Sequence, residues 1–87
     1  EPDKELIEFP CRYPIKAMGE ANQDIAGLLV GVLTKHQAKP HPDDVVYRKS
    51  GAGKYISVTA TIHATSRAQL EAIYTDLRKD TRIRFLL

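Results

Sequence analysis

Residues 55–64 read YISVTATIHA, from Tyr55 to Ala64, and alternate between polar and apolar side chains. Successive side chains of a β-strand point to opposite faces of its sheet. One face would therefore carry the apolar set Ile56, Val58, Ala60, Ile62 and Ala64, and the other the tyrosine, serine, threonines and histidine. The pattern predicts a strand over residues 55–64 that is buried on one face only.

A first strand is predicted near the N-terminal end of the chain. Residues 15–18 alternate in the same way until Gly19, which we expect to end the strand. Tyr13, Ile15 and Ala17 would then face the core.

A helix is predicted after this strand, because apolar residues recur at helical spacing over residues 25–33. Asn22 is the expected N-cap, and the helix should end near Gln37. Gly27 and Gly31 lower helix propensity, so we expect them to mark close packing of this helix on a sheet.

The middle of the chain predicts a loop, a short strand and a turn. Residues 39–43 contain two prolines, each of which pushes the preceding residue to extended geometry, so a helix is not expected there. Residues 45–47 are apolar and predict a short strand, and residues 50–53 a glycine-containing turn.

The last third predicts a second helix and a closing strand. Ser66 followed by Gln69 has the spacing of a capping box, and apolar residues then repeat at helical spacing as far as Lys79. Residues 82–87 predict a strand whose inward side chains would be Ile83, Phe85 and Leu87.

The order strand, helix, strand, strand, helix, strand is typical of the ferredoxin-like α+β sandwich, a four-stranded antiparallel sheet with two helices on one face. We expect the spatial order fourth, first, third, second strand. Residues 1–10 are interpreted as a loosely held N-terminal arm and residues 11–87 as one domain. The second face of the sheet would carry no helix.

Composition and charge bound the class of protein. The 87 residues are 43% hydrophobic and 28% charged, which is typical of one folded globular domain. The net charge of +2 argues against a dedicated nucleic-acid binder, whose surface is usually strongly basic. The single cysteine, Cys11, favours a cytoplasmic protein. The longest apolar run, residues 25–33, is too short to span a membrane, and the acidic residues 1–5 do not resemble an export signal.

The reactive side chains do not predict an enzyme. His36, His41 and His63 lie in separate elements without metal-ligand spacing, so we expect no metal, no cofactor and no catalytic residue. Small acylphosphatases share the predicted topology, but the connection at residues 18–22 lacks their phosphate-binding arginine. Residues 50–54 lie between two strands, which favours a hairpin turn over a phosphate-binding loop.

Several segments resemble the YbeD family of small bacterial proteins of unknown function. The resemblance runs from about Leu6 to the last residue and is carried by Glu8-Phe9-Pro10, Lys16-Ala17-Met18-Gly19, residues 53–58, Ala64-Thr65 with Gln69, residues 74–77 and residues 84–87. It implies a ferredoxin-like fold similar to the ACT regulatory domain, a cytoplasmic location and a regulatory role, with a link to lipoate metabolism. It implies no catalytic residue.

The topology predicts two candidate sites. The first is the connection formed by Gly19, Glu20, Ala21 and Asn22, where free helix N–H groups would suit a carboxylate; alternatively these residues only turn and cap the chain. The second is the open sheet face, where we place Lys16, Tyr55, Thr59, Thr61 and Arg84.

We therefore expect a non-enzymatic regulatory or binding module that contacts an unidentified protein or small molecule. A homodimer formed through the sheet is a further expectation, with Arg48 and Lys49 opposing pairing at one edge. The alternatives are an RNA-binding module and a small hydrolase of acylphosphatase-like shape. The RNA alternative depends on Tyr55, because Ser57 stands where the RNA-recognition motif has a second stacking ring.

Overall fold

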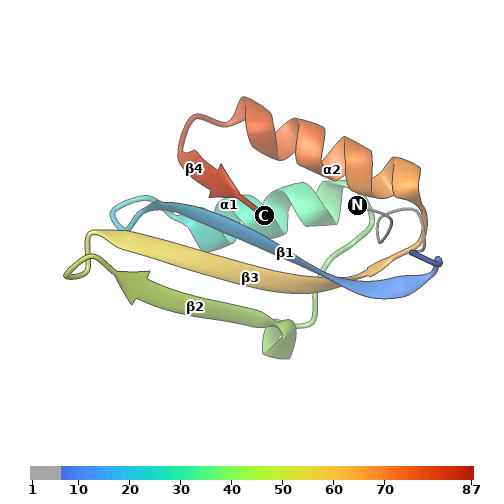
Figure 1. Cartoon of the computed structure of the whole chain (residues 1–87), viewed down its shortest axis with the longest axis horizontal. Helices are drawn as coiled ribbons and strands as arrows, with labels where there is room; N and C mark the ends of the chain where they lie inside the picture. The colour runs from blue at the N-terminus through green and yellow to red at the C-terminus, as the bar shows by residue number, and fades with distance from the viewer. Residues whose placement is uncertain (1–6) are drawn as a thin grey trace.

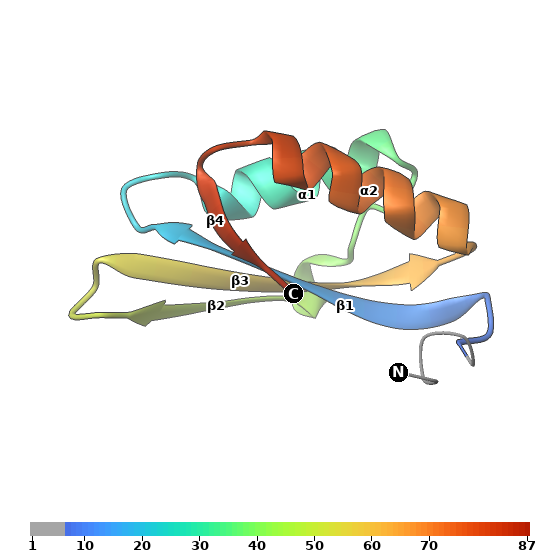
Figure 2. The same ribbon diagram turned by 45° about the horizontal axis from the view of Figure 1, so that its top comes forward.

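Over residues 7–87, four strands and two α-helices follow one another in the predicted order. The computed structural model describes residues 7–87, so residues 1–6 of the expected arm lie outside the described residues. The elements are β1 (Cys11–Glu20), α1 (Ile25–Lys35), the 3-10 helix η2 (Pro42–Asp44), β2 (Val45–Ser50), β3 (Tyr55–Ala64), α2 (Arg67–Lys79) and β4 (Ile83–Leu86). The sheet has the order β2-β3-β1-β4, and both helices lie on one side of it (Figure 1 and Figure 2). The ferredoxin-like prediction and the predicted strand order are confirmed.

β3 organises the sheet and the core. It pairs antiparallel with the whole of β1, from Cys11 opposite Ala64 to Glu20 opposite Tyr55, and with β2 on its other side. Its inward residues pack with those of β1 against the buried faces of the two helices. The largest fully buried side chains are Ile15, Ile25, Leu29, Leu33, Val58, Ile62, Ile73 and Leu77. Burial of each such side chain contributes about 1.5 to 3 kcal/mol, so this side of the sheet provides most of the stability.

β1 is longer than its sequence pattern indicates. We expected Gly19 to end the strand, but β1 continues to Glu20 and Gly19 is buried inside it. A methyl group on Gly19 would lie 2.5 Å from the backbone oxygen of Arg82 and 2.6 Å from Cδ1 of Ile25. Gly19 is therefore required by close packing and not by a turn, since any side chain would overlap its neighbours.

The start of α1 differs from the prediction. Asp24, not Asn22, is the N-cap, and its carboxylate accepts a hydrogen bond from the N–H of Gly27 at 3.0 Å. The predicted role of the helix glycines is also wrong, because Gly27 and Gly31 are exposed and neither approaches the sheet. A side chain on Gly27 would meet the Asp24 carboxylate, and one on Gly31 would meet nothing within 4 Å. The helix ends at Lys35, shortly before the predicted position.

The connections around β2 are more regular than expected. The prediction of no helix over residues 39–43 is wrong in part, since residues 42–44 form one turn of 3-10 helix. Pro42 is accommodated in its first turn, where the missing N–H costs nothing. β2 extends beyond the predicted residues 45–47 to Ser50. The turn to β3 contains three successive residues with positive φ, Gly51, Ala52 and Gly53, so the predicted glycine turn is confirmed.

α2 begins with the predicted cap. The Ser66 hydroxyl accepts a hydrogen bond from the N–H of Gln69 at 3.1 Å, and Oε1 of Gln69 accepts one from the N–H of Thr65 at 2.8 Å. Nε2 of Gln69 also donates to the carbonyl oxygen of His36 at 3.0 Å. One side chain therefore joins the start of α2 to the end of α1.

β4 contains the largest departure from the sequence pattern. Met18 pairs with Phe85, but the next residue, Gly19, pairs with Ile83, so Arg84 is an extra residue in a β-bulge. Ile83 and Leu86 pack against the core, whereas Phe85 and Leu87 are 67% and 75% exposed. The predicted inward direction of Phe85 and Leu87 is wrong, because the bulge interrupts the alternation on which that prediction depends.

Candidate binding surface

The candidate surface is the face of the sheet opposite the helices, which Figure 2 shows without a covering helix. Directly paired residues of neighbouring strands share a face, so the register assigns side chains to it. Val46, Thr59, Lys16 and Leu87 form one row across all four strands, and Arg48, Ser57, Met18 and Phe85 form the next. Tyr55 lies opposite Glu20 in a third row, and Thr61 lies opposite Pro14. The register thus places Lys16, Tyr55, Thr59 and Thr61 on this face, and the bulge residue Arg84 reaches it beside Phe85.

Large apolar side chains are exposed on this surface. Besides Phe85 and Leu87, the face carries Val46, which is 61% exposed, and Tyr55, which is 42% exposed. Tyr55 and Phe85 line a hollow of about 380 Å³ together with Met18 and Arg84. The sequence did not identify Val46, Phe85 and Leu87 as surface residues. For Phe85 and Leu87, only knowledge of the bulge in β4 would have identified them.

The charges of this surface fall into two groups. Arg12 pairs with Asp44 and Arg84 with Glu20, each at 3.1 Å, so these arginines are already neutralised. Lys16 and Arg48 form no ion pair with any carboxylate of residues 7–87. The surface therefore carries unpaired positive charge at Lys16 and Arg48, whereas the side-chain carboxylates of Glu20 and Asp44 that reach it are both paired.

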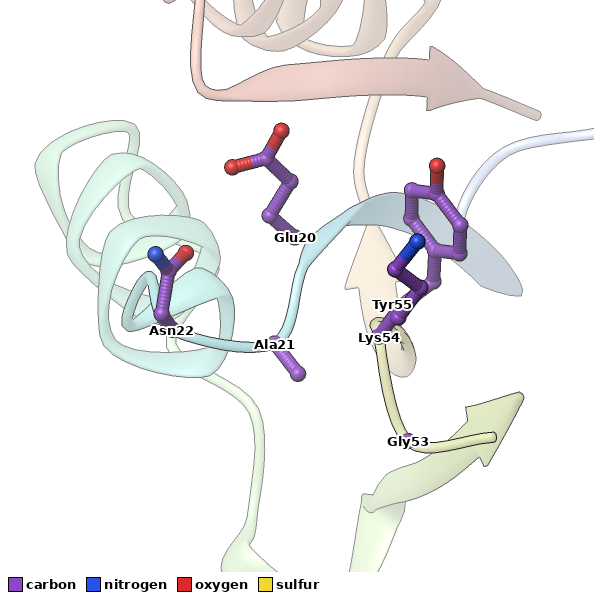
Figure 3. Close-up of a pocket in the computed structure, with 6 residues that line it drawn as sticks. All are labelled: Glu20, Ala21, Asn22, Gly53, Lys54 and Tyr55. Atoms are coloured by element: carbon purple, nitrogen blue, oxygen red, sulfur yellow. The ribbon is translucent and has the colours of Figure 1, made fainter. Parts of the chain in front are cut away.

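The predicted loop site lies at one end of this surface. Glu20, Ala21 and Asn22 line an open pocket of about 450 Å³, and Gly53, Lys54 and Tyr55 form its other side (Figure 3). The N–H of Ala21 donates to the carbonyl oxygen of Lys54 at 2.8 Å, which joins the two connections. Gly19, the fourth predicted residue, is buried in β1 and does not line the pocket.

The electrostatic argument for a carboxylate at this loop is weakened by the helix cap. The Asp24 carboxylate accepts the hydrogen bond of Gly27 at the start of α1 and places a negative charge at the positive end of the helix. A ligand carboxylate would have to compete with this group. Lys54, from the opposite side of the pocket, is the cation that remains for it.

The remaining clusters of titratable groups are structural. Nε2 of His36 lies 2.6 Å from Oδ2 of Asp76, and Nζ of Lys35 lies 3.2 Å from the same oxygen. The hydrogen bond from His36, followed by that from Lys35, holds the pKa of Asp76 below its ordinary value. These contacts join the end of α1 to α2.

Tyr74 joins α2 to the end of β4. Its hydroxyl donates to the carbonyl oxygen of Leu87 at 3.0 Å. Burial raises the pKa of Tyr74 far above its ordinary value, and the neighbouring Tyr13 raises it further. Cys11 is free and partly buried. Across residues 7–87 no three His, Cys, Asp or Glu side chains are grouped so as to hold a metal ion.

An antiparallel sheet with helices on one side and apolar and cationic groups on the other defines a small ferredoxin-like α+β domain with an uncovered sheet face. In the described part of the chain, neither helix is both long and apolar enough to cross a membrane.

The chain belongs to the family described as "Protein of unknown function (DUF493)", whose model matches residues 4–87. It is 36% identical over 87 residues to a UPF0250 protein of Janthinobacterium sp. (strain Marseille), covering 100% of this chain and 96% of that protein. It is 42% identical over 82 residues to a UPF0250 protein of Azotobacter vinelandii, covering 93% and 89% of the two chains. No solved structure gives a significant match. These relatives confirm the resemblance to the YbeD family and assign no activity.

Proposed function

We propose that the protein is a non-enzymatic, cytoplasmic binding module that recognises another protein through the uncovered face of its sheet. The observation that supports this proposal is the group of exposed apolar side chains on that face. Val46, Phe85 and Leu87 are each more than half exposed, and they come from the two edge strands and the residue after β4. Exposed apolar patches on a small domain mark interaction surfaces, because leaving them in water costs free energy.

The face is better suited to a partner than the edges of the sheet. On the β4 side of β1, the last backbone hydrogen bonds are the two that Lys16 exchanges with Leu87. The next N–H of β1 on that side would belong to the residue two positions before Lys16, which is Pro14. Proline has no N–H, so an added strand would lack a hydrogen bond there. Arg48 and Lys49 place two positive charges on the opposite edge, β2. A homodimer formed through β2 or through the uncovered part of β1 is thus disfavoured relative to contact through the face.

Photoreactive cross-linking in a bacterial host tests the proposal. The photoreactive residue p-benzoyl-phenylalanine would replace Phe85 on the open face or, as the control, Thr34, which is exposed on α1. We expect discrete protein adducts at position 85 that are absent at position 34. The same adducts at both positions, or none at position 85, would contradict a binding role for this face. Adducts digested by ribonuclease would support the RNA alternative, for which Phe85 now provides a second ring beside Tyr55.

A small-ligand role is a second candidate, favoured by the pocket between Glu20 and Lys54. An amide chemical-shift titration with free amino acids and with lipoate tests it. We expect shifts at Ala21, Asn22 and Lys54 at millimolar ligand if the pocket binds a carboxylate, because Lys54 is the nearby cation. Unchanged resonances there would remove this candidate. The same titration tests the link to lipoate that the family resemblance implies.

A further inference from the structure

We infer that the partner of the open face is an acidic, amphipathic protein segment, with carboxylates that meet Lys16 and Arg48 and apolar side chains that cover Met18, Phe85 and Leu87. This inference rests on the proposed function of the same face. It adds the chemical class of the partner, which the apolar side chains alone do not determine.

The spacing of the groups defines the segment. Lys16 lies in one row with Leu87, and Arg48 lies in the next row with Met18 and Phe85. β3 lies between the strands of Lys16 and Arg48, so these residues are two strand spacings and one row apart. With about 4.8 Å between neighbouring strands and about 6.7 Å between rows, their Cα atoms are roughly 12 Å apart. Two carboxylates about two turns apart along a helix would match this spacing. The segment's apolar side chains would lie on the β4 side of the line that joins the two carboxylates, over Met18 and Phe85.

Charge complementarity decides between an acidic partner and a second copy of the chain. The side-chain carboxylates that reach this face are already paired, Glu20 with Arg84 and Asp44 with Arg12. A second copy would therefore present Lys16 and Arg48 again, but neither of these side-chain carboxylates would be free to meet them. Like charges brought together at an interface oppose association, whereas an acidic segment would neutralise both cations.

A nucleic acid also carries negative charge, but it fits this surface less well. Val46 and Leu87 are exposed aliphatic side chains that cannot stack on bases as aromatic rings do. Lys16 and Arg48 are two cations of this face without an ion pair to residues 7–87, fewer than the phosphate contacts of a typical nucleic-acid interface. The mixture of aliphatic and cationic groups favours a protein segment.

Charge reversal with a matched control tests this inference. Arg48 and Lys49 are neighbours on β2, but Arg48 pairs with Ser57 on the open face and Lys49 with Ile56 on the helix side. Arg48→Glu and Lys49→Glu make the same change of charge on opposite faces of one strand. With the photoreactive residue at position 85, we expect Arg48→Glu and Lys16→Glu each to reduce the protein adduct at least about tenfold. Lys49→Glu should leave it within about twofold, and circular dichroism would verify that all three variants fold.

The cross-linked partner peptide, identified by mass spectrometry, completes the test. We expect it to contain acidic residues interspersed with apolar ones, and changing those acids to lysine should restore adduct formation with Arg48→Glu. A partner captured equally by Arg48→Glu and Lys49→Glu would overturn the acidic class while leaving the proposed function intact. Adducts of twice the chain mass or adducts to RNA would overturn it as well. Absence of any adduct specific to position 85 would instead contradict the proposed function itself.

Discussion

Replacing Gly19 by alanine should destabilise the protein strongly, although the change adds a single methyl group. The new Cβ would lie 2.5 Å from the backbone oxygen of Arg82 and 2.6 Å from Cδ1 of Ile25, both well inside van der Waals contact. The Ile25 side chain can rotate, but the Arg82 oxygen belongs to the backbone that leads into β4 and must move with it. Overpacking of this kind costs about 2 to 3 kcal/mol in a well-packed core. For a domain of this size that corresponds to a loss of about 10 to 20 °C in Tm.

Gly31→Ala is the matched control, because it adds the same methyl group to an exposed glycine with nothing within 4 Å. There alanine improves helix propensity, so we expect a gain of about 0.5 to 1 kcal/mol. Urea unfolding followed by circular dichroism would measure both variants against the parent. A Gly19→Ala variant as stable as the parent would refute the close packing at β1. A Gly31→Ala variant less stable than the parent would refute the conclusion that this glycine has no packing role.

Three further predictions concern the cap, the bulge and the interhelix contact. Asp24→Ala should cost about 1 kcal/mol in urea unfolding, since it removes the N-cap, whereas Asn22→Ala should change stability by less than about half of that. Phe85→Ser should change the unfolding free energy by about 0.5 kcal/mol or less, because Phe85 is exposed; a loss of several kcal/mol would place it in the core. Since His36 holds the pKa of Asp76 below its ordinary value, the stabilisation by Asp76 is present above that ordinary value and is lost as pH falls through the lower folded-state pKa. Stability curves measured from about pH 6 down to about pH 2 should therefore fall less steeply for Asp76→Asn than for the parent.

The fold could be predicted from the sequence wherever one face of an element is buried throughout. The strict alternation of residues 55–64 corresponds to a strand that pairs with β1 in one unbroken register over its whole length and with β2 over residues 55–60. The apolar spacing of Leu70, Ile73 and Leu77 in α2 likewise corresponds to three buried positions. In these segments the apolar pattern of the sequence coincides with the positions that tertiary packing buries, so the pattern predicts the fold.

The prediction was wrong where a small residue has more than one physical role. Gly19 suggested a turn, but the structure uses it for close packing beside Ile25. Gly27 and Gly31 suggested close packing, but they lie on the exposed side of α1. Composition cannot separate these roles, because a glycine that leaves room for a neighbour and one that merely lacks a side chain look identical in the sequence.

The candidate surface was only half predictable for a related reason. Lys16, Thr59 and Thr61 follow from strand alternation alone, whereas Phe85 reaches the surface through one extra residue in β4. A bulge depends on how β4 meets β1 and has no signature in the residues 83–86 themselves. Two of the side chains that carry the functional proposal, Phe85 and Leu87, are thus ones that the alternation assigned to the core.

Two single-residue deletions would distinguish the effect of the bulge on stability from the contribution of the exposed Phe85 ring to binding. Without Arg84, Phe85 would still lie opposite Met18 and Ile83 opposite Gly19, so the ladder would become regular and the ring would stay on the open face. Without Phe85, Arg84 would take the place opposite Met18 in the same regular ladder, and the ring would be lost. Because both deletions make the same change in the backbone, we expect their unfolding free energies to agree within about 1 kcal/mol, since the exposed pair of Arg84 contributes little. Capture of a partner by a photoreactive residue at position 46, in place of Val46, should then persist without Arg84 and fall about tenfold without Phe85. Equal capture by the two variants would show that the ring does not contribute to recognition, and the open face would lose its principal apolar contact.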